Sequence, residues 1–493
     1  MEFTSLQFFL FTGGGVILLH LPPLVRYRAL ILVAMNAAFI ASYCAHLPDI
    51  LPLAIFLMLG FAIVELIRRH PSRLALGAGI VATIVPFVFF KHYTFLSSVP
   101  SWPLPYLVVG FSYILFRLLH MMIDTQAGEL PRIRPLAFFN YTCNFLTFVS
   151  GPIQRYQDFA ESYRRKNDAL NPDEVFAVFS RIASGFFKVL VISAIADYLF
   201  LSLTRAVLGA DRTSAQYGPL ELPSDVHLPL LPIAVIYAAA AVAYTTYLYY
   251  NFSGYMDIVI GIGRLLGQQL PENFNKPFLA RNFFEFWSRW HMTLSEWFKT
   301  YMFNPLLKLL AGSLGSRASM PYLGVLAFFA TFLVMGIWHG TTTVFVVYGL
   351  FLGAGASANK LWQIAMAGML GKKSLRALSQ RLAYVYFCRG LTAAYFSVAL
   401  TCFWVNGHQF VGLMRNLGVI GAIGSVALIT LAASLAMMVL DLAKSWAIGM
   451  TDSLRAAAKG LVLRNLLLAG RVLVILAVSS FFHRAPEFVY RVF

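Results

Sequence analysis

Two histidines are the residues of this 493-residue chain best suited to acid–base chemistry. His291 lies in "FWSRWHMTLSEWF" (Phe286–Phe298), a segment that also holds three tryptophans. His339 lies in "VMGIWHGTTTVF", near the middle of a stretch between Arg317 and Lys360 that has no Asp, Glu, Lys or Arg. A neutral imidazole can take a proton from an alcohol near pH 7, and burial keeps it neutral. The two histidines therefore predict a site of general acid–base catalysis.

Each histidine also has a structural explanation. If Phe286–Phe298 is one helix, Trp287, Trp290 and Trp297 share a face with His291, which is typical of a helix lying at the membrane surface. His339 is flanked by glycines, and a lone histidine at a helix junction often serves only as a hydrogen-bonding group. Both explanations stay open at this point.

Other catalytic chemistries find little support in the sequence. There is no HExxH motif, no group of carboxylates and no GxSxG elbow, so a zinc hydrolase and a covalent serine mechanism are disfavoured. The four cysteines are scattered through apolar segments without a close pair, which argues against a disulfide framework or a zinc site. We therefore expect no metal and no bound cofactor. The cysteines are Cys44, Cys143, Cys388 and Cys402.

The elements that position the histidines are membrane helices. The chain is 59% hydrophobic and only 12% charged, well below the charge content of soluble domains. We predict an all-α polytopic membrane protein with about 11–13 spans plus re-entrant or interfacial helices around a tunnel. The clearest spans are the apolar runs Ala29–Ala45, Ile50–Ile67, Leu74–Phe90, Leu104–Met122, Leu228–Tyr249, Tyr322–Trp338 and Leu466–Phe482.

The net charge is +17, and the basic residues are distributed along the chain as in a membrane protein and not as in a nucleic-acid-binding protein. Basic residues cluster between the hydrophobic runs, which is the pattern of cytoplasmic loops and places the N-terminus outside. The first apolar segment lacks the basic start and the cleavage site of a removable signal peptide. Basic cytoplasmic loops favour an acidic carrier or a nucleotide-bearing donor as a partner.

We predict a single membrane domain over residues 1–493. Its middle part, residues 131–310, interrupts apolar segments with stretches rich in proline, asparagine and other polar residues, such as Ser150–Phe159 and Pro271–Phe286. Irregular backbone at membrane depth is stable only where protein or a water-filled cavity satisfies its polar groups. These stretches therefore predict a functional site.

The run Asn251–Phe298, followed by "GIWHG" at Gly336–Gly340, resembles the membrane-bound O-acyltransferase family. It is most similar to the bacterial branch that acts in alginate O-acetylation and in the D-alanylation of teichoic acid. "SGPIQRY" (Ser150–Tyr156) is similar to a further motif of that branch. The resemblance covers residues 105–365 as the catalytic core and leaves 366–493 as C-terminal spans with an extracytoplasmic aromatic tail.

The resemblance implies a helical fold with a tunnel through the bilayer. It assigns His339 as the catalytic base and His291 as the second catalytic histidine. The positions that it implies to line or brace the tunnel are Asn273, Asn275, Trp287, Arg289 and Trp338. The chain departs from the family pattern at Lys299 and Thr300, where relatives commonly have Arg-Asp.

The resemblance also implies a reaction. An acyl group of acetyl or D-alanyl type would pass from a cytoplasmic thioester, either acetyl-coenzyme A or an acyl carrier protein, to hydroxyls of a polymer outside a bacterial cell membrane. An extracytoplasmic partner of the SGNH type is an expected receiver. The tail residues Phe488, Tyr490 and Phe493 resemble the C-terminal motif of a small partner in the teichoic acid system, which makes Tyr490 a candidate acyl relay. The alternative is an aromatic anchor at the membrane interface.

Two other functions remain open from the sequence. A lipid O-acyltransferase would use the same histidines with an acceptor inside the bilayer. A transporter without chemistry would use broken helices to line a substrate path. Replacement of His339 separates the last function from the enzymes, because only an enzyme needs the imidazole.

Overall fold

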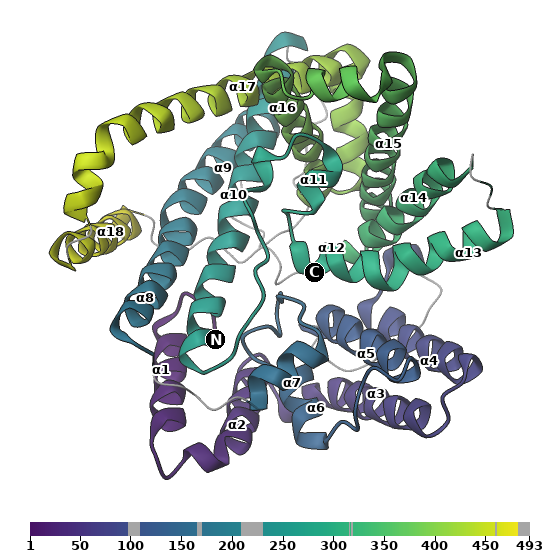
Figure 1. Cartoon of the computed structure of the whole chain (residues 1–493), viewed down its shortest axis with the longest axis vertical. Helices are drawn as coiled ribbons and strands as arrows, with labels where there is room; N and C mark the ends of the chain where they lie inside the picture. The colour runs from purple at the N-terminus through teal and green to yellow at the C-terminus, as the bar shows by residue number, and fades with distance from the viewer. Residues whose placement is uncertain are drawn as a thin grey trace. The chain divides into compact units, whose positions relative to one another are not determined.

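The computed structural model describes residues 1–96, 109–164, 170–208, 230–314, 316, 319–458 and 461–481 (Figure 1). These residues form helices and no strand, which confirms the predicted all-α class. Eight helices are long and apolar enough to cross a membrane, or nine if the bent pair Leu6–His20 and Val25–Ala41 is one span. This described part thus holds fewer spans than the predicted 11–13. One reason is length, because α5 (Phe111–Gln126) has only 16 residues.

The described helices belong to two compact units. The first contains Met1–Phe186 and Phe252–Asn273. In it, small residues let helices approach closely: a Cβ atom on Gly60 would lie 2.6 Å from Leu118, and one on Gly79 would lie 2.6 Å from Ile63. Its helices are α1 (Leu6–His20), α2 (Arg28–Ala41), α3 (Leu51–Arg69), α4 (Arg73–Lys91), α5, α6 (Pro135–Thr142), α7 (Tyr156–Arg164), most of α8 (Pro172–Phe187) and the end of α10 (Leu230–Leu265).

The predicted irregular backbone is confirmed in this first unit. Residues 143–155 form turns and coil, and nearly all of them are buried. The buried Arg117 satisfies backbone carbonyls in this segment and beside it: its guanidinium donates to the carbonyls of Thr142 at 2.7 Å and Thr147 at 2.6 Å. The hydroxyl of Tyr255 donates to the carbonyl of Leu146 at 2.9 Å. Protein groups thus replace water for this segment.

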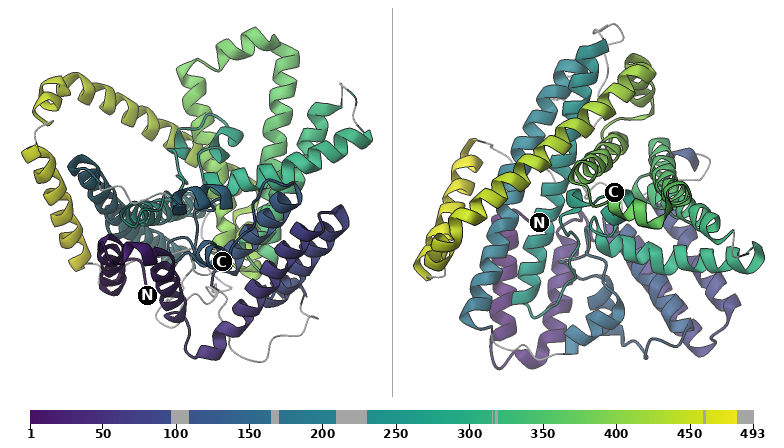
Figure 2. Two further views of the ribbon diagram at one scale, coloured as in Figure 1. Left: turned by 60° about the horizontal axis from the view of Figure 1, so that its bottom comes forward. Right: turned by 45° about the horizontal axis from the view of Figure 1, so that its top comes forward.

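The second unit contains Phe187–Asn251 and Phe274–Pro486. Its two longest helices are interrupted by glycines with a positive φ, Gly371 in α15 and Gly418 in α17, and both helices bend (Figure 2). Its helices are α9 (Ala194–Leu208), the first part of α10, α11 (Phe283–Trp287), α12 (Met292–Phe298), α13 (Asn304–Leu314), α14 (Met320–His339), α15 (Thr343–Leu378), α16 (Leu382–Ala399), α17 (Gly407–Ala458) and α18 (Leu461–Phe481).

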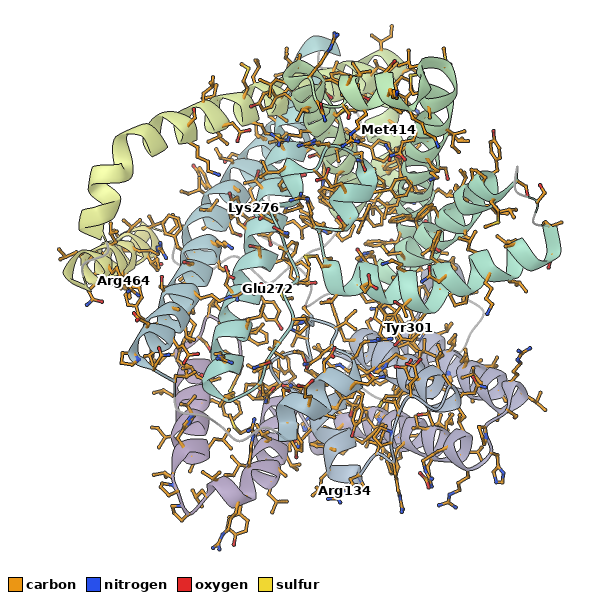
Figure 3. The ribbon with its side chains drawn as sticks, in the orientation of Figure 1. Arg134, Glu272, Lys276, Tyr301, Met414 and Arg464 are labelled. Atoms are coloured by element: carbon orange, nitrogen blue, oxygen red, sulfur yellow. The ribbon has the colours of Figure 1, made fainter. Side chains whose placement is uncertain are left out.

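A π-helical turn, Lys299–Phe303, joins α12 to α13 and carries Tyr301 (Figure 3). It includes Lys299 and Thr300, the two residues at which the chain departs from the expected family pattern. Lys299 is exposed and pairs with Glu296 at 3.1 Å. The departure therefore lies on a solvent-accessible turn of the helix and not in the core of this unit.

Candidate active site

His339 is the last residue of α14, and its side chain is buried, with 3% of its surface exposed. Aromatic rings surround it. The centroids of Trp338, Tyr348 and Phe403 lie 4.9, 5.6 and 5.6 Å from the centroid of the imidazole. A ring held in this way has little freedom to rotate, and a neutral imidazole has one nitrogen that can accept a proton. Such a side chain is suited to accept a proton.

Backbone contact between α14 and α15 fixes the position of His339. A Cβ atom on Gly336 would lie 2.1 Å from the Cα atom of Gly349, so the two helices touch without intervening side chains. A Cβ atom on Gly340 would lie 2.1 Å from the ring of Phe345. The expectation that Gly336 and Gly340 allow close packing and a break beside His339 is confirmed.

His291 lies at a break between two short helices, and the expected continuous helix over Phe286–Phe298 is wrong. Helix α11 ends at Trp287, and α12 begins at Met292. Between them His291 adopts φ 43° and ψ 54°, a left-handed conformation that costs a residue with a Cβ atom roughly 1–2 kcal/mol. Its side chain is completely buried. Backbone strain at a buried titratable residue is characteristic of functional sites.

Trp290 anchors this break. Its ring packs against Phe396 at 4.7 Å, Phe274 at 5.1 Å and Phe286 at 5.6 Å between centroids. Trp287 and Trp290 are only 4% and 2% exposed. The interpretation of these two tryptophans as a belt at the membrane surface is therefore wrong, because the protein itself covers them. The indole N–H of Trp287 has no hydrogen-bond acceptor among the described residues.

The two histidines interact electrostatically. Burial lowers the pKa of the His291 imidazole well below its usual value, and the nearby His339 lowers it further. A proton on His339 thus makes a second proton on His291 less favourable. The structure brings together two histidines from sequence segments 48 residues apart, one at a strained loop and one at the end of a helix.

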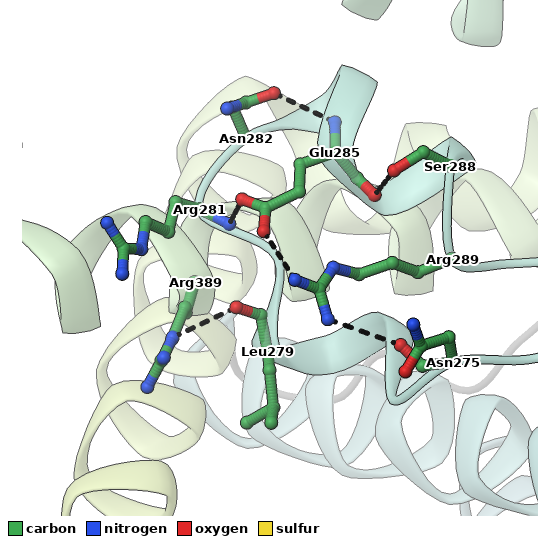
Figure 4. A network of polar contacts seen from close by, with 8 residues as sticks. All are labelled: Asn275, Leu279, Arg281, Asn282, Glu285, Ser288, Arg289 and Arg389. Atoms are coloured by element: carbon green, nitrogen blue, oxygen red, sulfur yellow. Dashed lines mark hydrogen bonds and ion pairs between the residues drawn. The ribbon is translucent and has the colours of Figure 1, made fainter.

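A polar network braces the loop that leads to His291 (Figure 4). The carboxylate of Glu285 accepts from the backbone N–H of Arg281 and forms an ion pair with Arg289, both at 2.8 Å. The backbone N–H of Asn275 donates to the carbonyl of Arg289 at 2.9 Å, and the Arg289 guanidinium donates to the carbonyl of Asn275 at 3.4 Å. Arg289 and the backbone of Asn275 therefore hold the segment before His291 in place.

The other expected site residues lie in different environments. Trp338 is buried beside His339 in the second unit. Asn273 belongs to the first unit, where its side chain is fully buried and its amide donates to the sulfur of Met256 at 3.6 Å. Tyr490, with Phe488 and Phe493, lies outside the described residues.

The sequence argument missed several structural partners of the site. Glu285 is the centre of the network, and its spacing of four residues from Arg289 was the available signal for a helical ion pair. Arg389 of α16 was also missed, although its guanidinium donates to the carbonyl of Leu279 at 3.1 Å and pairs with Asp441 at 3.0 Å. No sequence pattern joins these three distant positions.

Across the described ranges, no group of three or more His, Cys, Asp or Glu side chains is arranged to hold a metal ion. The chemistry that the residues of this site offer is proton transfer by two imidazoles inside an aromatic and apolar enclosure.

Several known proteins are similar to this chain. The chain is 28% identical over 293 residues to the teichoic acid D-alanyltransferase of Bacillus subtilis, covering 58% of this chain and 67% of that protein. The corresponding protein of Streptococcus thermophilus is 31% identical over 257 residues, covering 52% of this chain and 57% of its own length.

The probable alginate O-acetylase AlgI of Azotobacter vinelandii is 27% identical over 409 residues, covering 78% of this chain and 73% of that protein. The model of the membrane-bound O-acyltransferase family matches residues 87–396, which is more than half of the chain and includes both histidines. This chain belongs to the membrane-bound O-acyltransferase family.

Proposed function

We propose that this multi-pass membrane protein transfers an acyl group from a cytoplasmic thioester to hydroxyl groups of an extracytoplasmic cell-envelope polymer, in the cell membrane of a bacterium. The observation that carries the proposal is the pair of buried, electrostatically interacting histidines, His291 and His339. The names of the relatives support an acyl group of D-alanyl or acetyl type and an envelope polymer as acceptor. Acetyl-coenzyme A and an acyl or D-alanyl carrier protein are the two donor classes.

In the proposed reaction His339 acts as the general base. Its neutral imidazole takes the proton of the acceptor hydroxyl while the hydroxyl oxygen attacks the thioester carbonyl. The carbon–sulfur bond then breaks, and the imidazolium returns the proton to the leaving thiolate. The products are an ester and a free thiol, and His339 is neutral again.

His291 has a supporting role in the same proposal. Because its pKa is well below the usual value, it stays neutral while His339 carries the proton. A neutral imidazole beside the reacting groups can orient the acceptor or donate one hydrogen bond without adding a second positive charge. The left-handed backbone at position 291 fixes the direction in which this ring projects.

The experiment compares a strain lacking this protein with strains that produce the wild type or His339→Ala. Mass spectrometry of the envelope polymer shows which acyl group is lost in the deletion and restored by the wild type. The proposal expects no restoration by His339→Ala at a normal level of inserted protein. Full restoration would favour the transporter alternative. Acyl loss from a membrane lipid, with an unchanged polymer, would favour the lipid acyltransferase.

The role of Tyr490 as an acyl relay and a partner of the SGNH type outside the membrane stay predictions within this proposal. Tyr490→Phe keeps the aromatic ring and removes the hydroxyl oxygen that would carry the acyl group. Loss of polymer acylation in Tyr490→Phe, with retention in Phe488→Tyr, would support the relay. Full acylation of the polymer in Tyr490→Phe would contradict the relay and favour the alternative, an aromatic anchor at the membrane interface.

A further inference from the structure

The second unit contains a cavity of about 690 Å³ that the proposed reaction does not use. Helices α15 and α16 and the residues at the start of α11 form its walls. Its volume lies within the range of roughly 300–1,000 Å³ that is usual for pockets that bind small molecules. The lining residues that the proposal and its tests use directly are Arg281, Ala358, Trp362, Phe387, Cys388 and Leu391.

One wall of the cavity is continuous with the surface of two membrane helices. Trp362, Phe387 and Leu391 line it, and they are 52%, 53% and 42% exposed. They lie on α15 and α16, both of which are long and apolar enough to cross a membrane. Large apolar side chains exposed on such helices face lipid chains. The cavity is therefore accessible from the hydrocarbon region.

One residue of the cavity lining carries a positive charge without a counter-ion. Arg281 lines the cavity, and its guanidinium forms no hydrogen bond or ion pair with any described residue. Figure 4 shows the guanidinium turned away from Glu285, although the backbone N–H of Arg281 donates to that carboxylate. Arg389, the neighbouring cation in the same view, is already paired with Asp441. None of the described lining residues is acidic.

More positive charge lies close in sequence to two other lining residues. Leu375 and Ser379 line the cavity at the end of α15, and four basic residues lie within six positions of one or the other. The predicted topology places this basic segment, the last turns of α15 and its connection to α16, at the cytoplasmic surface. Basic residues at that surface attract the anionic lipids of the inner leaflet. The four residues are Lys372, Lys373, Arg376 and Arg381.

We propose that the cavity binds one anionic phospholipid of the cytoplasmic leaflet. The phosphate lies at Arg281, whose planar guanidinium can donate two parallel hydrogen bonds to phosphate oxygens. An acyl chain lies against Trp362, Phe387 and Leu391. The site is independent of the proposed acyl transfer, since it is defined by binding and not by turnover.

The test is native mass spectrometry of the purified full-length protein in detergent, titrated with phosphatidylglycerol or with phosphatidylcholine. The wild type should hold one phosphatidylglycerol and bind phosphatidylcholine much more weakly. Arg281→Gln should weaken phosphatidylglycerol binding about tenfold, as expected for the loss of a hydrogen bond to a charged group. Lys308→Gln, an exposed charge on α13 away from the cavity lining, is the matched control and should bind like the wild type.

A second pair of variants tests the cavity itself. Ala358 is exposed and lines the cavity, so Ala358→Trp should fill the space and abolish binding without disturbing the core. Ala354 is exposed one turn earlier on α15 and is not a lining residue, so Ala354→Trp should bind normally. In a Cys44→Ser background, bound phosphatidylglycerol should slow the alkylation of Cys388, which is half-buried in the cavity wall.

Three results would overturn the proposal: equal binding of the two lipids, unchanged binding by Ala358→Trp, or displacement of the lipid by a short-chain acyl-coenzyme A. The last result would assign the cavity to a thioester donor. Because every readout is either lipid occupancy or the alkylation of Cys388, a failure of the proposed acyl transfer would leave these measurements unaffected.

Discussion

His339 lies close enough to His291 to lower the pKa of the His291 imidazole, in addition to the larger lowering caused by burial. One proton can therefore reside on this pair far more easily than two. That arrangement suits a reaction in which a single proton moves from an alcohol to an imidazole and then to a thiolate.

Replacement of the two histidines should affect acyl transfer unequally. His339→Ala should lower the rate by about 10²–10⁴-fold, the usual contribution of a general base. His291→Asn should lower it less, because it removes the imidazole but keeps a residue type that tolerates the left-handed conformation. The measurement is transfer from a labelled thioester donor by purified protein of equal folded content. Equal losses in the two variants would contradict the assignment of His339 as the sole base.

The stability of the protein should fall in mild acid because of His291. The unfolded chain binds a proton at this residue near the ordinary pKa of 6.5, whereas the folded protein does not. The part of the free energy of unfolding that depends on a neutral His291 is therefore fully present above pH 6.5. It is lost as the pH falls below this value, by at most about 1.4 kcal/mol per pH unit. Thermal unfolding in detergent from pH 7.5 to 5.5 should show a smaller loss for His291→Asn. Parallel curves for the two proteins would exclude a buried neutral imidazole at position 291.

A side chain at Gly336 should separate α14 from α15. A Cβ atom there would meet the backbone of Gly349, so Gly336→Ala should destabilise the protein by about 1–3 kcal/mol and displace His339. Gly324, on the same helix, has open space around its Cβ position, and Gly324→Ala is the matched control. Thermal unfolding and transfer activity should both fall for Gly336→Ala only. Similar behaviour of the two variants would mean that the helix contact does not position the histidine.

The ion pair of Glu285 with Arg289 should support the loop before His291. Both side chains are partly exposed, at 28% and 30%, so Glu285→Gln should cost only about 1 kcal/mol of stability. Activity should fall as well, since Arg289 also holds Asn275. Glu296→Gln removes a pair in which both side chains are more than 60% exposed, and it should change neither quantity. If neither variant changed stability or activity, the pair of Glu285 with Arg289 would not support the loop before His291.

The sequence predicted the helical membrane class and the family to which the segments around both histidines belong, because these depend on composition and on local motifs. It predicted the glycine-mediated break at His339 for the same reason. It did not predict the break at His291. The spacing of Trp287, Trp290 and Trp297 fits one amphipathic helix, and the packing of Trp290 against α16 overrides that local preference.

Partners that meet only in the folded chain also could not be predicted. Arg389 reaches Leu279 and Asp441 across 110 and 52 positions of sequence, and no period or motif connects them. The described residues hold fewer candidate spans than the hydropathy of the sequence predicts, because hydropathy does not distinguish a short buried helix such as α5 from one that crosses the bilayer.

The hairpin of α14 and α15 also constrains how the protein is made. Only Gly340–Thr342 separates the two helices, and the nearest charges are Arg317, which precedes α14, and Lys360, which lies halfway along α15. During synthesis, no charged loop between the helices could retain one of them on its own. We therefore expect the two helices to enter the bilayer as a pair, with the turn that follows His339 on the side of the membrane opposite to these charges.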